Sequence, residues 1–162
     1  MGCDIHSFAE VKRNDKWEMI EEEIFPFYEG FDGDNTTEPF YWRSYFMFEF
    51  LAGVRNYDGI EPISLPKGFP KDSEYLNSKS RYDDSLPTIF QEILYDDYYH
   101  SLSYLTLREL IEYDYNKTYF SKLRQVIFPL KESLGENYFK HLEILKGLGN
   151  PDDVRIVIYF DN

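Results

Sequence analysis

The stretch Val154-Arg-Ile-Val-Ile-Tyr-Phe160, close to the end of the chain, carries the strongest strand signal in the sequence. Its β-branched and aromatic side chains are the types enriched in strands. At the other end, residues Cys3 to Val11 alternate between two faces with the period of a strand. Asn14-Asp15 then predicts a turn, and Trp17 to Ile20 the returning strand of a hairpin. We therefore expect the two chain ends to meet in one small antiparallel sheet.

Between the two ends the hydrophobic pattern becomes helical. Helices are expected over Tyr41 to Ala52, Leu86 to Leu94, the residues after Thr106, Asn116 to Leu134, and Glu136 to Lys146. Thr106-Leu-Arg-Glu109 is a capping box, which marks a helix start. Glu21 to Phe40 and Arg55 to Arg81 are expected to be irregular loops. The predicted fold class is α+β, a small antiparallel sheet joining the N- and C-terminal strands, packed with about four to five helices and long loops.

Length and charge restrict the class of protein. A chain of 162 residues that is 43% hydrophobic fits a single globular domain over residues 1–162. A formal net charge of −13 would repel a phosphate backbone, so binding of long nucleic acid is not expected. The charge is uneven, because Glu18 to Glu38 holds eight acids and no Lys or Arg, whereas Lys117 to Lys146 holds six basic and three acidic residues. The acidic stretch is either a solvated face or a surface that mimics nucleic acid.

Cellular location is indicated by the cysteine count and the hydropathy pattern. Cys3 is the single cysteine, so an internal disulfide is ruled out and the reducing cytoplasm is the expected location. No apolar stretch approaches the length of a membrane span, so no membrane partner is expected. The sequence also lacks a Gly-rich phosphate loop, a nucleophile elbow and a cysteine metal cluster. No organic cofactor is therefore predicted.

Asp4 and His6 form the first candidate site. They lie two residues apart on one strand, so their side chains share a face about 7 Å apart. They could hold a divalent metal, or Asp4 could orient His6 as a general base. The alternative is a histidine that hydrogen-bonds a carbonyl at a strand edge. Asp161, at the end of the last strand, could face Asp4 if the two strands adjoin.

The second candidate site is the segment Asp96 to Ser103, expected to be a loop that enters the capping-box helix. Backbone amides and the hydroxyls of Ser101 and Ser103 could hold a phosphate there, with His100 as acid, base or donor. Alternatively, the two serines only satisfy turn amides. His141, among apolar residues on a predicted helix, is expected to be structural. If the protein is an enzyme, the predicted catalytic residues are Asp4, His6 and His100.

Arg and Lys side chains near the irregular loop supply further candidates, because Arg is a bidentate partner for phosphate or carboxylate. The alternative is that these cations form structural ion pairs with an acidic chain. The predicted ligand-binding residues are Arg43, Arg55, Asn56, Lys67, Ser101, Ser103 and Tyr104.

Several blocks of sequence carry a family resemblance that extends from the first residue to the last. They are Met1-Gly-Cys-Asp-Ile-His6, Leu51-Ala-Gly-Val-Arg-Asn56, Pro62-Ile-Ser-Leu-Pro-Lys-Gly68, His100-Ser-Leu-Ser-Tyr-Leu-Thr-Leu107 and Val154-Arg-Ile-Val-Ile-Tyr-Phe-Asp-Asn162. In these blocks the chain resembles a family of small, functionally uncharacterised phage and bacterial proteins. The family has an Asp two residues before the second histidine, where this chain has Tyr98. The resemblance implies a location in the cytoplasm of an infected or lysogenic bacterial host and an anti-defence role.

Three functional hypotheses follow. The first is binding and sequestration of a small phosphate-bearing nucleotide, such as a host immune signal, in a pocket between the sheet ends and Asp96 to Ser103. The second is phosphodiesterase-like hydrolysis of such a nucleotide by His6 and His100, or by a divalent metal on Asp4 and His6. The third is an acidic inhibitor that covers a basic surface of a host protein with Glu21 to Phe40. A homo-oligomer is a further candidate assembly. The first two hypotheses require His6 and His100 to lie close together.

Overall fold

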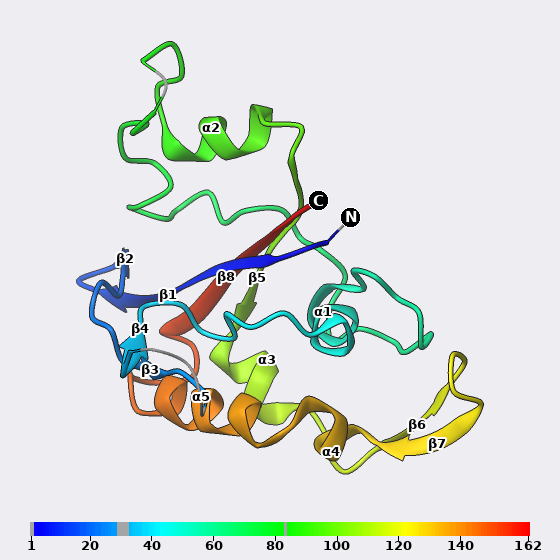
Figure 1. Cartoon of the computed structure of the whole chain (residues 1–162). Helices are drawn as coiled ribbons and strands as arrows, with labels where there is room; N and C mark the ends of the chain where they lie inside the picture. The colour runs from blue at the N-terminus through cyan, green and yellow to red at the C-terminus, as the bar shows by residue number, and fades with distance from the viewer. Residues whose placement is uncertain (1, 29–32, 83) are drawn as a thin grey trace.

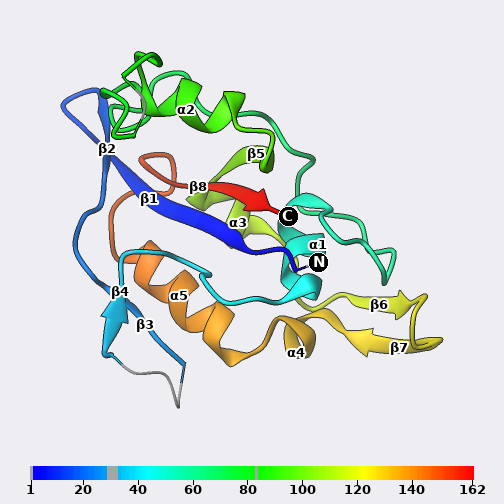
Figure 2. The same ribbon diagram turned by 45° about the horizontal axis from the view of Figure 1, so that its top comes forward.

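The computed structural model describes residues 2–28, 33–82 and 84–162 (Figure 1). Its main sheet is antiparallel and has the strand order β2-β1-β8-β5. These strands are β1 (Ile5–Arg13), β2 (Lys16–Met19), β5 (Tyr99–Thr106) and β8 (Val154–Asp161). The predicted fold class and the meeting of the two chain ends are confirmed, and both views show the ends side by side (Figures 1 and 2).

Local sequence explains the β1–β2 hairpin and its register. Asn14 and Asp15 have φ values of 50° and 62°, the positive pair that a two-residue turn of this kind requires. In the register of β1 with β8, Ile5 lies opposite Phe160 and His6 lies opposite Tyr159. Successive residues of a strand point to opposite faces, so each face of the sheet receives its own set of side chains.

The two faces of the sheet pack against different elements. The helices over the larger core are α1 (Tyr45–Ala52), α3 (Leu107–Glu112), α4 (Leu130–Leu134) and α5 (Glu136–Lys146). On the other face, α2 (Ile89–Tyr95) contributes Ile89 and Ile93 to a smaller core with Phe8 and Val157. The helix boundaries follow the sequence signals: Gly53 ends α1 with φ of 70°, and the Thr106 capping box starts α3.

The helix expected over Asn116 to Leu134 is confirmed only for its end, α4, and is wrong for the residues before it. The segment forms a hairpin of β6 (Thr118–Ser121) and β7 (Val126–Pro129), followed by α4. Its aromatic and β-branched residues favour strands, and the ring of Tyr119 packs 4.9 Å from that of Phe46 on α1. The tertiary contact and the strand propensity together override the helical spacing. The hairpin projects from the body beside α4 (Figure 1).

The loop expected over Asp96 to Ser103 is also partly wrong, because β5 begins at Tyr99. The pairing of β5 with β8 shifts between His100 and Ser103, where Ser101 adopts a φ of 53°. This irregularity is a β-bulge, and a bulge in a short edge strand leaves no clear signal in the periodicity of the sequence.

The two predicted irregular stretches are largely confirmed. Within Glu21 to Phe40 the structure adds a two-stranded sheet of β3 (Phe25–Pro26) and β4 (Asn35–Thr36), and residues 29–32 lie outside the described chain. His141 on α5 anchors this insert, because its Nδ1 accepts from the Phe40 amide at 3.0 Å and its Nε2 donates to the Pro26 carbonyl at 2.9 Å. The structural role expected for His141 is confirmed. Within the described ranges, none of the helices has the length and apolarity to cross a membrane.

Candidate functional site

The ends of β1 and β8 bring Asp4, His6 and Asp161 together. The Asp161 carboxylate accepts the Asp4 amide through Oδ1 at 2.9 Å and bonds His6 Nε2 through Oδ2 at 2.8 Å. In return the Asp161 amide donates to the Asp4 carbonyl at 3.1 Å. A carboxylate only accepts hydrogen bonds, so the proton of the neutral imidazole sits on Nε2. The expectation that Asp161 faces Asp4 is therefore confirmed, and the partner that orients His6 is Asp161.

The Asp4 carboxylate is bound to Arg43 instead of facing His6. Arg43 donates from Nε and Nη2 to the two carboxylate oxygens at 2.7 and 2.6 Å. This bidentate pair lowers the pKa of Asp4, mainly through the hydrogen bonds from Arg43. The described residues also contain no cluster of three or more His, Cys, Asp or Glu side chains that could hold a metal. The predicted divalent-metal site on Asp4 and His6 is therefore not supported, and Arg43 is an ion-pair partner.

The partly exposed His6 ring lies in an aromatic and acidic setting. It stacks on Tyr159 with a centroid distance of 4.9 Å and meets the edge of Tyr99 at 5.4 Å. Burial raises the pKa of the Tyr159 hydroxyl and of the Glu38 carboxyl. Among the described residues, His6 Nδ1 has no hydrogen-bond partner. The His6–Asp161 pair can therefore accept a proton at Nδ1.

His100 does not share a site with His6. It lies opposite Phe160 in the register, whereas His6 lies opposite Tyr159, and these two neighbours on β8 point to opposite faces. His100 Nδ1 instead bonds the Ser101 hydroxyl at 3.0 Å, and its ring stacks loosely on Phe160 at 6.2 Å. The first two hypotheses require His6 and His100 to lie close together in a pocket between the sheet ends and Asp96 to Ser103, and the register does not bring them together.

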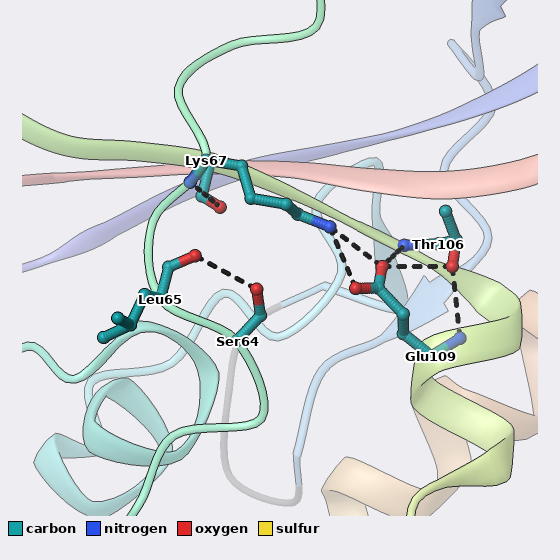
Figure 3. A network of polar contacts seen from close by, with 6 residues as sticks. Ser64, Leu65, Lys67, Thr106 and Glu109 are labelled. Atoms are coloured by element: carbon teal, nitrogen blue, oxygen red, sulfur yellow. Dashed lines mark hydrogen bonds and ion pairs between the residues drawn. The ribbon is translucent and has the colours of Figure 1, made fainter.

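Lys67 reaches Glu109 at the start of α3 (Figure 3) and also contacts Ser103 and Tyr104 on β5. The Lys67 amide donates to Ser103 Oγ at 3.0 Å, and Lys67 Nζ lies 4.4 Å from the centroid of the Tyr104 ring. The same ammonium group pairs with both oxygens of Glu109, at 2.9 and 3.0 Å. These groups bind one another and cover the open edge of the sheet, a structural role that edge strands need. The expectation of ligand binding by these three residues has no support in this geometry.

Arg55 and Asn56 take two different structural positions. Arg55 Nη2 donates to Asn162 Oδ1 at 3.4 Å, and hydrogen bonds to Cys3 and Tyr57 raise the pKa of its guanidinium. Asn56 shapes the following loop, because Oδ1 accepts from the Gly59 amide at 2.7 Å and Nδ2 donates to the Ile60 carbonyl at 3.0 Å. Arg55 therefore joins the chain ends, while Asn56 supports a different region.

The loop that Asn56 supports forms one wall of a cavity of about 390 Å³, which we call the hairpin cavity. Its other walls are the residues after α3 and strand β6. It is lined by Gly59, Ile60, Glu61, Tyr113, Lys117, Thr118, Tyr119, Phe120, Lys122 and Leu130. Lys117 Nζ lies 4.9 Å from the centroid of the Tyr113 ring. This site is not among the predicted ones, because its hairpin lies in a segment that was expected to be helical. The one available signal was the local excess of Lys and Arg after Lys117.

The loop wall of the hairpin cavity is well braced. The buried Glu49 carboxylate accepts from the amides of Tyr57 and Asp58, at 2.6 and 3.1 Å through Oε1. Asp58 in turn accepts from the Lys122 amide at 3.1 Å through its carbonyl, which fixes the hairpin against the loop. A Cβ atom at position 59 would lie 2.5 Å from the aliphatic stem of Lys122, which is too close for an ordinary contact. The φ of 73° at Gly59 also favours glycine. The cavity is therefore formed by the fold before any ligand arrives.

Comparisons with known proteins add no relative. No protein-family model matches the chain, and no curated protein or solved structure matches it. The resemblance to phage and bacterial proteins stays a prediction.

Proposed function

We propose that the chain binds a small phosphate-bearing nucleotide in the hairpin cavity. The observation that carries the proposal is a preformed space of about 390 Å³ lined by two lysines, Lys117 and Lys122, in which Lys117 Nζ lies 4.9 Å from the centroid of the Tyr113 ring. Ammonium groups attract phosphate, and tyrosine rings stack on bases. Preformed cavities of roughly this volume suit small-molecule ligands.

Local charge makes an anionic ligand compatible with an acidic chain. The segment Lys117 to Lys131 holds four Lys or Arg residues and no acid, although the whole chain has a formal charge of −13. Glu61 is the one acid among the residues that line the cavity. A small ligand experiences mainly the charges within a Debye length, about 8–10 Å at ordinary ionic strength. The hairpin cavity can therefore attract a nucleotide while the remaining surface repels long nucleic acid.

The lining residues favour sequestration over turnover. They include no histidine and no cysteine, and Glu61 is their single carboxylate. A hydrolase for phosphate esters usually needs a paired acid and base or a metal. A nucleotide held without chemistry is removed from solution, which is the role that the family resemblance implied for a host signal.

Neutralising both lysines is the direct test. The double variant Lys117→Met/Lys122→Met keeps the aliphatic stems and is expected to weaken nucleotide binding at least about a hundredfold, since each of the two charged hydrogen bonds contributes about 1.5–3 kcal/mol. Calorimetric titration with a panel of cyclic and linear nucleotides measures the affinity. The control Lys79→Met/Lys140→Met makes the same charge change outside the cavity. Equal losses in the two double variants, or no binding by the unmodified chain, would reject the site.

Hydrolysis at the His6–Asp161 pair is a second candidate, because Asp161 orients His6 and leaves Nδ1 open. If nucleotides are converted to products, His6→Gln should slow turnover by about a hundredfold or more. The products are read by chromatography before and after heat denaturation of the protein. Intact nucleotide released only after denaturation supports sequestration. Turnover that survives His6→Gln would exclude the pair as its base.

A further inference from the structure

The outer face of hairpin β6–β7 is an exposed apolar surface. Phe120 and Ile127 form a cross-strand pair and are 51% and 69% exposed, and Leu123 in the turn is 68% exposed. Tyr119 and Phe128, the neighbouring pair, stack on each other at 5.9 Å, and Tyr119 contacts the core on the inner face. Clustered large apolar side chains on a projecting element commonly mark an interaction surface. Phe120 also lines the hairpin cavity, but Leu123 and Ile127 line neither the cavity nor the core, so the hairpin carries apolar area that neither uses.

Charge limits what can cover this face. Lys122 and Arg124 flank Leu123 in the turn, and no acid lies between Lys117 and Lys131. The complementary surface is therefore acidic and offers apolar contacts.

This chain has such a surface at the opposite end of the molecule. Beside α2 lies a cavity of about 680 Å³, lined by Tyr82, Leu86, Glu92, Tyr95, Asp96, Asp97 and Tyr99. Three carboxylates and four apolar or aromatic side chains line it, and no Lys or Arg is among its lining residues. Tyr95 is 67% exposed at its rim. We call it the α2 cavity.

We propose that the hairpin of one copy docks in the α2 cavity of a second copy, in a head-to-tail assembly. The hairpin and α2 lie at opposite ends of the molecule in both views (Figures 1 and 2), so a copy cannot place its own hairpin in its own cavity. A contact between two different surfaces is heterologous and adds copies in sequence. The turn cations meet Asp96 and Asp97, and Leu123, Phe120 and Ile127 cover the aromatic wall.

Exchanging charges between the two surfaces tests the docking. Arg124→Glu reverses the hairpin turn, and Asp97→Lys reverses a lining residue of the α2 cavity. Each variant alone is expected to self-associate about tenfold more weakly, because like charges then face each other. An equimolar mixture should regain association, because each acidic surface again meets a basic one. Sedimentation velocity over a wide range of protein concentration measures all four samples.

Two controls keep the outcome decisive. Unchanged thermal unfolding midpoints show that both exposed substitutions leave the fold intact. Arg13→Glu, a charge reversal on the exposed end of β1, should leave self-association unchanged. A chain that stays monomeric at every concentration would overturn the proposal. A mixture that stays as weakly associated as its two components would also overturn it. So would a loss of association in Arg124→Glu that Asp97→Lys does not share.

Discussion

Arg155→Ala is expected to destabilise the folded chain by about 3–5 kcal/mol, the usual effect of removing one partner of a buried ion pair. Arg155 on β8 is 4% exposed, and its Nε donates to Glu10 Oε1 at 2.9 Å while Nη1 donates to Asp72 at 2.9 Å. Its guanidinium lies 4.0 Å from the centroid of the Trp17 ring. Alanine would leave the fully buried Glu10 carboxylate without a cation. Urea unfolding of both proteins at neutral pH gives the difference directly.

Lower pH and a second variant separate lost charge pairing from lost packing. Burial raises the pKa of Glu10, and Arg155 opposes that rise, so the variant should raise the pKa further. The difference in unfolding free energy between Arg155→Ala and the unmodified chain should then decrease as the pH falls, because protonation of Glu10 removes the buried charge. Arg108→Ala breaks an exposed pair with Asp152 and should destabilise by less than about 1 kcal/mol. Equal effects for the two arginines would contradict the argument.

Features read within one segment could be predicted from the sequence. The alternation of Cys3 to Val11 and the β-branched run after Val154 report directly on backbone period, and both became paired strands. Thr106 and Glu109 form their capping box through contacts three residues apart, which a local pattern records completely. These features depend on neighbours in sequence, so local reasoning was sufficient.

The candidate site depended on contacts between segments, which a local pattern does not contain. Whether His6 and His100 share a face is decided by the register of β1 and β5 against β8 and by the bulge at Ser101. A shift of one residue moves a side chain to the other face. The hairpin cavity likewise depends on Tyr119 packing on Phe46. The sequence could nominate chemically suitable residues, but the grouping of those residues is a tertiary property.

Acidification is expected to destabilise the chain through His141. Burial lowers the pKa of this histidine to about 4 from an ordinary 6.5, because its ring is buried and neutral between Phe40 and Pro26. Between about pH 6.5 and pH 4, His141 is protonated in the unfolded chain and stays neutral in the folded chain. Above about pH 6.5 the ring is neutral in both states, so His141 does not reduce the free energy of unfolding. That free energy falls by about 3 kcal/mol through His141 as the pH decreases to about 4.

The contribution of His141 is isolated by comparing unfolding free energies at about pH 7 and about pH 4 in the unmodified chain and in His141→Asn. Carboxylates titrate in the same window and affect both proteins, so their contribution cancels in the difference between them. Asparagine loses some packing at every pH but cannot take up a proton, and its loss between the two pH values should be smaller by about 3 kcal/mol. Parallel pH profiles for the unmodified chain and His141→Asn would show that His141 does not link the insert to acid stability.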